Sequence, residues 1–266
     1  MTMFGMTREG QMIQAITPIH NTVVVGGMDS DKTFGYVPQN VLLETEKSMF
    51  VLDMYGELED TYSDKENQGY QVFVYDLNHA NILETFKRDL TKKKNQKRIM
   101  FVQAGDGVTG QQVYALLDEL RKVQWREGLH IVLDRYECYQ FPQITSMFSL
   151  WRVFRVGISI VIQSMFSLNN CMERNVILNN SHFLLCQGGH SEEESEWTYK
   201  FMKKEAIVHD KELLYKISSL KGKGALLISH IEVLKKGSNH IFIDKLHSNE
   251  VYTMLNQNKQ TNAYAV

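Results

Sequence analysis

The residues best suited to chemistry in this sequence lie between a short apolar run, Thr22–Val25, and the segment Gly26–Thr33 (GGMDSDKT). A phosphate-binding loop of the form G-x-x-x-x-G-K-[ST] uses glycines so that backbone N–H groups approach the phosphates, and a lysine that reaches the outer ones. The first glycine, the lysine and the threonine of this pattern are present, whereas Asp31 replaces the second glycine. The segment therefore predicts a damaged phosphate loop between a strand and a helix.

Two carboxylates, Asp29 and Asp31, stand where that loop normally offers open backbone. At about 5 Å and an effective dielectric of about 20, each like-charge pair costs about 3 kcal/mol. Micromolar binding is worth only about 8 kcal/mol in total, so the two acids would remove most of it. Magnesium bound to a carboxylate would soften the loss. The alternative is an ordinary strand-to-helix turn with Asp29 or Ser30 as the N-cap.

The elements that must position this loop are short apolar runs that recur along the chain, many of them without polar alternation. Such runs are typical of parallel strands buried on both faces. The expected strands are Asn21–Val25, Ser48–Leu52, Gln71–Tyr75, Ile99–Gln103, His130–Leu133, Ser159–Ile162, His182–Cys186, Ala225–Ile228 and His240–Ile243. The segments between them include helical periodicity over Gly110–Gln124 and a capping box, Ser191 with Glu194, that opens a helix over Ser191–Lys204. This alternation predicts an α/β fold with a doubly wound, mostly parallel sheet.

The length and composition of the chain favour one globular domain over residues 1–266. With 43% hydrophobic and 23% charged residues and a net charge of -2, the chain supports a sizeable core and is not a general polyanion binder. Its three widely spaced cysteines offer no disulfide framework, which favours a reducing compartment. No stretch approaches the roughly 20 apolar residues of a membrane helix, and no signal peptide is visible. The histidines show no metal-ligand spacing.

One stretch, Thr91–Arg98, is strongly basic. Its cations could bind nucleic-acid phosphates, and counterion release would make that binding depend on salt. The candidate nucleic-acid residues are Lys92, Lys93, Lys94, Lys97 and Arg98. The alternative is a solvated loop or helix end. A further open alternative concerns Asp53 and Glu57, which form either an acid couple or a support for the loop that follows their strand.

Several blocks, in order, resemble the TraG/TraD-type coupling proteins of conjugation and type IV secretion, a group within the FtsK/HerA branch of RecA-like P-loop ATPases. The resemblance spans residues 20–230, and residues 231–266 read as a C-terminal extension. The matching blocks are Asn21–Thr33, Gly35–Asn40, Ser48–Leu58, Gly69–Val72, His130–Glu137, Ser159–Ser164 and Asn179–Gly189 with the helix that carries Trp197. Two features common in that family, an N-terminal membrane anchor and a large helical insertion after the strand near Tyr75, have no counterpart here.

The resemblance implies a RecA-like core that uses ATP and Mg²⁺. It assigns nucleotide binding to Gly26, Gly27, Ser30, Lys32 and Thr33, and metal binding to Thr33 and Asp134. It assigns catalytic roles to Asp134, to the phosphate-sensing Gln163 and to Arg152, which in such proteins can reach a neighbouring subunit's nucleotide. Arg135 occupies the place of the glutamate that polarises water, and a cation cannot act as that base. We further expect Arg135 to pair with Asp29 or Asp31 and so to fill the phosphate site from within.

Little or no ATPase activity is therefore expected, and the sequence favours a non-hydrolysing interaction or regulatory module in conjugative DNA transfer or type IV secretion. The alternatives are an active minimal DNA-translocating ATPase and a decayed gene product. The implied partners are relaxosome or channel proteins, a full-length coupling ATPase, DNA, or further subunits in a homo- or hetero-oligomer. The implied location is the cytoplasm, with a peripheral position at the inner face of the bacterial membrane as a variant of it.

Overall fold

Eleven strands form a single sheet in the computed structural model, which describes residues 2–7, 9–15, 19–27, 30, 32–92, 96–168, 171–189, 191–202, 211–220, 224–229 and 240–244. The parallel strands are β3 (Thr22–Gly26), β4 (Ser48–Asp53), β5 (Gln71–Asp76), β6 (Arg98–Gln103), β7 (Leu129–Leu133), β8 (Val156–Ile162) and β9 (Phe183–Gln187). Every residue of β3, β4, β7, β8 and β9 is buried, which explains their unbroken apolar runs.

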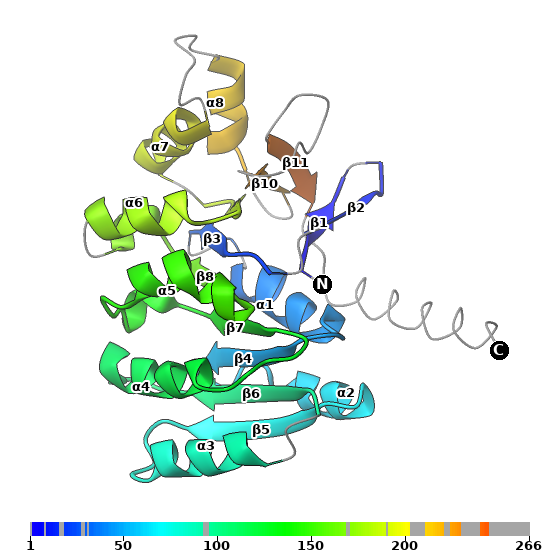
Figure 1. The fold of residues 1–266 in the computed structure, drawn as a ribbon. Coiled ribbons are helices and arrows are strands. Elements are labelled where there is room, and N and C mark those ends of the chain that lie inside the picture. Colours follow the sequence, from blue (N-terminus) through cyan, green and yellow to red (C-terminus); the bar gives the residue numbers. More distant parts are fainter. Residues whose placement is uncertain are drawn as a thin grey trace, which may run out of the picture.

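The order across the sheet is β2-β1-β11-β10-β9-β3-β8-β7-β4-β6-β5. All nine runs expected as strands are confirmed. An antiparallel wing of β10 (Gly224–Ser229), β11 (His240–Asp244), β1 (Met3–Met6) and β2 (Met12–Gln14) extends the parallel part. The hairpin of β1 and β2 was not anticipated, because its short, methionine-rich strands show no clear alternation and only one β-branched residue, Ile13. In Figure 1 the wing lies above the parallel strands, whose arrowheads point to the left.

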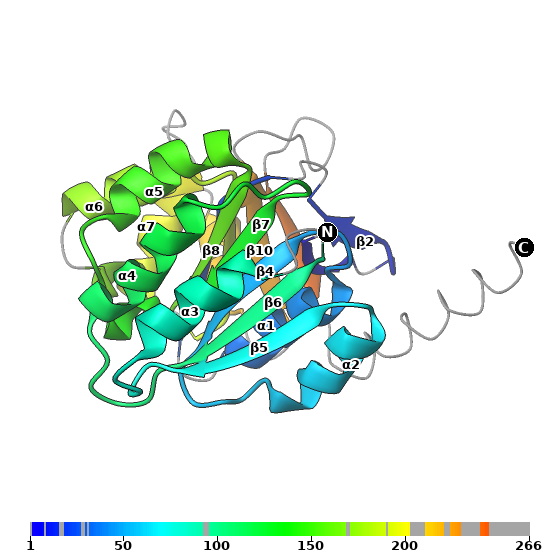
Figure 2. The same ribbon diagram turned by 60° about the horizontal axis from the view of Figure 1, so that its bottom comes forward.

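Helices cover both faces of the sheet unequally, as Figure 2 shows from below. The larger layer holds α3 (Ile82–Thr91), α4 (Gly110–Arg121), α5 (Ile144–Leu150), α6 (Cys171–Asn179), α7 (Glu192–Met202) and α8 (Lys211–Ser218), and the other face carries α1 (Lys32–Leu43) and α2 (Tyr62–Asn67). Short 3₁₀ turns are η2 (Glu59–Thr61), η3 (Tyr136–Cys138), η4 (Trp151–Phe154) and η5 (Met165–Ser167). The doubly wound α/β fold is thus confirmed.

Capping residues start two helices of the larger layer. The predicted capping box is present at α7, where Ser191 Oγ accepts from Glu194 N and Glu194 Oε2 accepts from Ser191 N, both at 3.1 Å. A second box at α4 pairs Thr109 with Gln112. Each box satisfies N–H groups that a helix leaves without intrahelical partners, so the helices begin at fixed residues.

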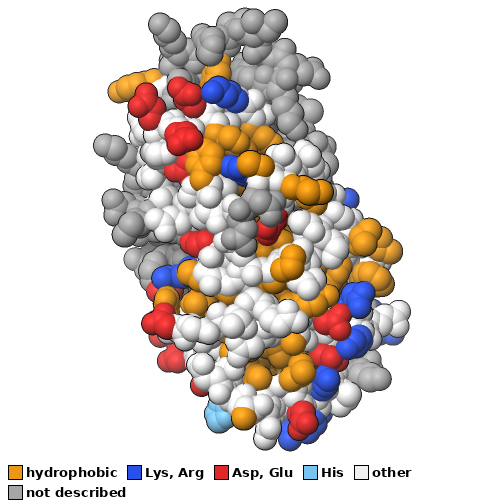
Figure 3. Space-filling model, turned by 90° about the vertical axis from the view of Figure 1, so that its left-hand side faces the viewer, with side chains coloured by type: hydrophobic (Ala, Val, Ile, Leu, Met, Phe, Trp, Pro, Cys, Tyr) orange, Lys and Arg blue, Asp and Glu red, His pale blue; other side chains and the backbone are white. Residues whose placement is uncertain are grey.

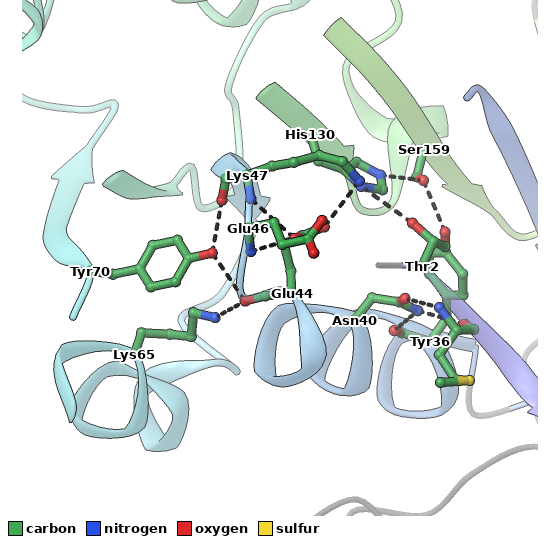
Figure 4. A network of polar contacts seen from close by, with 11 residues as sticks. Thr2, Tyr36, Asn40, Glu44, Glu46, Lys47, Lys65, Tyr70, His130 and Ser159 are labelled. Atoms are coloured by element: carbon green, nitrogen blue, oxygen red, sulfur yellow. Dashed lines mark hydrogen bonds and ion pairs between the residues drawn. The ribbon is translucent and has the colours of Figure 1, made fainter. Parts of the chain in front are cut away.

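A buried polar network fastens α1 between the wing and the parallel strands (Figure 4). The Asn40 side chain accepts from Met3 N at 2.7 Å and donates to Met3 O at 2.9 Å, which ties β1 to the helix. The Tyr36 hydroxyl bonds Ser159 Oγ at 2.9 Å, and Ser159 Oγ also bonds His130 Nε2 at 2.8 Å. Because these groups are buried, each hydrogen bond avoids the cost of an unsatisfied polar atom. The network therefore holds the helix that follows the phosphate loop in one place.

Candidate functional site: the carboxyl edge of the parallel strands

Several of the predicted nucleotide-site residues lie at the carboxyl ends of three neighbouring strands. Strand β8 lies between β3 and β7, so Gln163 at the end of β8 stands between the loop after β3 and Asp134 at the end of β7. Ligands of open α/β sheets bind at this edge. The structure therefore brings Asp134 and Gln163 to one edge with Gly26 and Gly27.

The phosphate loop is described at Gly26, Gly27 and Ser30, and again from Lys32 onward as the backbone of α1. The expectations for Asp29 and Asp31, and for the side chains of Lys32 and Thr33, lie outside the described residues. Gly27 N donates to Gly188 O at 3.1 Å, which attaches the loop to the end of β9. A Cβ on Gly27 would lie 2.0 Å from Gly189 O, so the backbones touch there and only glycine fits.

Ser30 closes the loop on itself. Its backbone N–H donates to Gly27 O at 3.1 Å, and its hydroxyl donates to the same carbonyl at 2.7 Å. The residue is only 1% exposed, and a Cβ on Gly26 would lie 2.2 Å from Ser30 Oγ. A phosphate loop binds its ligand by turning backbone N–H groups into the hollow of the loop. Here the N–H groups of Gly27 and Ser30 both donate to protein carbonyls, so these two groups are not free to bind a phosphate.

The residue that follows Asp134 points away from the phosphate loop. Arg135 has a left-handed backbone, with φ 52°, and its Nη2 lies 2.9 Å from Glu57 Oε1 and 3.1 Å from Glu57 Oε2. The guanidinium also stacks over the Tyr55 ring, 4.9 Å from its centre. Arg135 thus bonds on the β4 side of β7, whereas the phosphate loop follows β3 on the other side. Its predicted pairing with Asp29 or Asp31 lies outside the described residues.

The same guanidinium weakens the case for magnesium at Asp134. Arg135 Nε lies 3.8 Å from Asp134 Oδ2, and Asp134 is 2% exposed. A positive charge this close competes with a divalent cation for the carboxylate. Among the described residues, no group of three or more histidine, cysteine or acidic side chains is arranged to hold a metal ion. The Asp134 carboxylate therefore has a cationic neighbour at the place where the sequence resemblance implied Mg²⁺.

Asp53 shapes the loop that carries Glu57. Its Oδ1 accepts from Glu57 N at 2.9 Å and its Oδ2 accepts from Leu58 N at 3.0 Å. Burial raises the pKa of the Asp53 carboxyl, although the N–H groups of Leu58 and Glu57 oppose that rise. Of the two interpretations left open for Asp53 and Glu57, this geometry supports the structural one, since Asp53 fixes the backbone and Glu57 binds Arg135.

Glu137 is a neighbour of the site that sequence reasoning did not single out. It belongs to η3 and its Oε1 accepts from Gln163 N at 3.2 Å. The contact joins the segment after β7 to the carboxyl end of β8. Its only sequence signal is its place three residues after Asp134, which does not by itself indicate where the side chain points.

Arg152 lies at the opposite edge of the sheet from Asp134 and Gln163. It belongs to η4, immediately before β8, and its Nη1 lies 2.6 Å from His182 Nε2, just before β9. Strand β8 has seven residues, which at about 3.3 Å per residue separates the two edges by roughly 20 Å. Arg152 is thus remote from the phosphate loop of its own chain, and a role at a neighbouring subunit stays a prediction.

The described members of the basic stretch make contacts within the protein. Arg98 is 2% exposed and its guanidinium donates to Leu90 O at 2.7 Å and to Lys92 O. The expectation that Arg98 binds nucleic-acid phosphates is therefore not met, because its charge is committed to the backbone at the end of α3. Lys97 Nζ donates to Thr45 O at 2.6 Å and Lys92 Nζ to Asp89 Oδ1 at 2.7 Å. Lys93 and Lys94 lie outside the described residues.

Figure 3 faces the carboxyl edge and shows acidic and basic side chains mixed across it, without a continuous basic patch in the part of the chain that is described. A surface that tracks a nucleic-acid backbone carries a stripe or cluster of cations. In the same described part, no helix is long and apolar enough to cross a bilayer.

Comparison with known proteins finds similarity at the level of structure. No family model matches the sequence, and no curated protein sequence matches it significantly. Among solved structures, VirB4 of Thermoanaerobacter pseudethanolicus has a TM-score of 0.61 at 10% identity, over 94% of this chain and 98% of that one. The bacterial conjugative coupling protein TrwBdeltaN70 has a TM-score of 0.60 at 8% identity, over 93% and 90% of the two chains.

A third similar structure is the genome packaging NTPase B204 of Sulfolobus turreted icosahedral virus 2 in complex with AMPPCP. Its TM-score is 0.54 at 14% identity, over 87% of this chain and 100% of that one. At these identities the similarities establish the fold alone, which is that of the RecA-like P-loop ATPases.

Proposed function

We propose that this protein is a P-loop domain that does not hydrolyse nucleotide and serves as an interaction or regulatory module in DNA transfer or type IV secretion. The observation that carries the proposal is the ion pair of Arg135 with Glu57 at the place where a hydrolysing site requires an unpaired acid. The self-closed loop at Ser30 supports it independently. The fold itself is retained, so a binding surface shaped like that of the motors can persist without turnover.

The partners we propose are proteins of the transfer apparatus, namely relaxosome proteins, channel proteins or a full-length coupling ATPase. Support for this class comes from the fold similarity to a conjugative coupling protein and to VirB4. DNA is a weaker candidate, because the described cations of the basic stretch are bound to carbonyls and carboxylates of the chain itself.

The decisive experiment measures ATP·Mg²⁺ binding by calorimetry and phosphate release by the purified protein. We expect no turnover above background and no measurable binding heat. The variant Asp29→Gly/Asp31→Gly/Arg135→Glu should regain binding, and adding Lys32→Ala to it should abolish that gain. Turnover by the natural protein that disappears in its Lys32→Ala variant would overturn the proposal.

The second candidate is an active minimal DNA-translocating ATPase. It is favoured by one observation, the order β3-β8-β7, which sets Gln163 between the phosphate loop and Asp134 as a hydrolytic site would require. DNA-stimulated phosphate release separates the two candidates. A decayed gene product is separated from both by affinity capture from the source cell, because only a functional module recovers a specific transfer protein.

A further inference from the structure

An exposed apolar cluster marks the amino edge of the sheet, on the far side from the phosphate loop. Leu150, Val153 and Phe154 are 59%, 82% and 48% exposed, whereas Trp151 between them is buried at 4%. They belong to the end of α5 and to η4, and their spacing of three and four residues sets them on one side of that helical run. Trp151 thus anchors a short corner whose other apolar side chains face water.

The cluster is flanked by cations and lacks acids in its own segment. No Asp or Glu occurs between Cys138 and Met172, and the only charged residues there are Arg152 and Arg155. Both arginines are exposed. We call Leu150, Arg152, Val153, Phe154 and Arg155 the η4 patch. Its composition is apolar side chains bordered by guanidinium groups, whereas the carboxyl edge mixes acidic and basic side chains (Figure 3).

The neighbouring turns add one further cation and one acid. Leu129 N donates to Arg155 O at 3.0 Å, so the turn that carries the exposed Arg126 and Glu127 lies beside the patch. On the other side, the segment before β9 contributes Asn180 and His182, and His182 Nε2 contacts Arg152. The patch and these turns together carry three arginines against Glu127, a local positive balance in a chain that is formally -2.

The backbone makes the patch a protruding corner. Arg155 has a left-handed conformation, with φ 61°, which ends η4 and turns the chain into β8. A protein interface of standard size buries about 800 Å² on each partner around an apolar centre, more than three side chains at the tip of a corner provide. A bilayer interface needs only that apolar tips enter the headgroup region while arginines meet the lipid phosphates.

We propose that the η4 patch docks this domain onto an anionic bilayer surface, with Leu150, Val153 and Phe154 inserted and Arg152 and Arg155 at the phosphates. This binding site is independent of the nucleotide site, because it lies at the opposite edge of the sheet. Docking in this orientation turns the carboxyl edge, with Asp134 and Gln163, away from the membrane. That edge then stays accessible to proteins of the transfer apparatus.

The test is co-sedimentation of the full chain with vesicles of phosphatidylcholine alone or mixed with phosphatidylglycerol. We expect binding to the mixed vesicles that weakens as salt is raised. Arg152→Gln/Arg155→Gln should lower that partitioning about tenfold or more, and Val153→Glu should lower it comparably. Phe154→Ser removes apolar area without adding charge and should also weaken binding.

Met172 offers a matched control, since it is 78% exposed on α6 at the other end of the structure. Met172→Glu should bind mixed vesicles as the natural protein does, and circular dichroism melts should show all variants folded. The proposal is overturned if the natural protein stays in the supernatant with both kinds of vesicle, which would leave a protein as the occupant. It is equally overturned if Val153→Glu binds like the natural chain or if Met172→Glu loses binding to the same extent.

Discussion

Arg135 Nη2 lies 2.9 Å from Glu57 Oε1 and 3.1 Å from Glu57 Oε2, and this pair joins the segment after β7 to the loop after β4. The loop is itself fixed, because the buried Asp53 accepts from Glu57 N and Leu58 N. The Glu57 carboxylate thus holds Arg135, and the Asp53 carboxylate in turn holds the backbone of Glu57. Replacing Arg135 by an acidic residue would therefore leave two carboxylates, that of Asp134 and that of the new residue, near Glu57.

The strength of this pair can be measured by a double-mutant cycle with Arg135→Met and Glu57→Gln. We expect a coupling of about 0.5–1 kcal/mol in the free energy of unfolding, because both side chains are partly exposed and the contact is to both carboxylate oxygens. Urea unfolding of the four proteins gives the value. A coupling of zero would mean that the pair contributes no stability and that Arg135 is held by Tyr55 alone.

The left-handed backbone of Arg135 gives a separate prediction. At φ 52° a side chain costs about 1 kcal/mol relative to glycine, and both Arg135→Gly and Arg135→Ala remove the ion pair. Arg135→Gly should therefore be more stable than Arg135→Ala by about 1 kcal/mol. Thermal unfolding of the two variants under the same conditions tests this, and equal midpoints would show that the backbone relaxes.

Gly27→Ala should destabilise the fold by about 1–3 kcal/mol, the usual cost of overpacking. The added Cβ would lie 2.0 Å from Gly189 O, and backbone on both sides leaves little room to move. Gly69→Ala is the control, because nothing lies within 4 Å of its Cβ and only its φ of +83° opposes the change. A loss at Gly27 no larger than at Gly69 would show that the two loops separate freely.

Lys65 predicts a pH dependence of stability. It is fully buried, and its Nζ donates to Glu44 O at 2.5 Å and to Gln68 Oε1 at 2.7 Å (Figure 4). Burial lowers the pKa of Lys65 to about 7, against an opposing effect of Glu44. Above pH 7 the folded chain therefore binds fewer protons here than the unfolded chain, whose lysines titrate near 10.4. Stability should accordingly rise with pH from this residue.

The measurable window is pH 7 to 9, because unfolded tyrosines ionise above it while burial raises the pKa of Tyr36 and of Tyr62 to about 12. In that window Lys65 should raise the free energy of unfolding by up to about 1.4 kcal/mol per pH unit. The variant Lys65→Met should lack this increase. Urea unfolding of both proteins across the window checks the difference. Parallel profiles would show that Lys65 stays charged when the chain is folded.

Arg98→Met should cost about 2–4 kcal/mol of stability, because it leaves the buried carbonyl of Leu90 and the part-buried carbonyl of Lys92 without their donor. Lys87→Met is the matched control, since the Lys87 side chain is 48% exposed and its ion pair with Glu119 is a surface one. Denaturant unfolding should separate the two variants clearly. Similar small losses would reopen Arg98 as a residue available to nucleic acid.

The parallel part of this fold could be predicted because its strands are buried on both faces, and such strands appear in the sequence as unbroken apolar runs. Val23 and Val132, for example, are fully buried in runs without a polar break. The capping box at Ser191 could also be predicted, because it depends only on two residues that are three positions apart in the sequence. The hairpin of β1 and β2 could not be predicted in this way, because its pairing with β11 depends on residues far along the chain.

Within the site, the sequence predicted which residues lie at the same edge of the sheet, but it did not predict where their side chains point. That Asp134 and Gln163 share an edge follows from strand order, which a resemblance can supply. The side-chain direction of Arg135 depends on a left-handed backbone and on a carboxylate 78 residues away in sequence. Opposite charge alone favoured Asp29 and Asp31 as partners, whereas Glu57 binds Arg135 from the loop that Asp53 organises.

The antiparallel wing has a consequence for how the molecule is made. Met6 in β1 pairs with Asp244 in β11, so β1 leaves the ribosome long before this partner strand exists, although its other partner, β2, follows directly. Contacts so distant in sequence form slowly, because loop closure must come first. During synthesis β3 to β9 can assemble while β1 and β2 have no sheet to join, and chaperones would meet the growing protein there first.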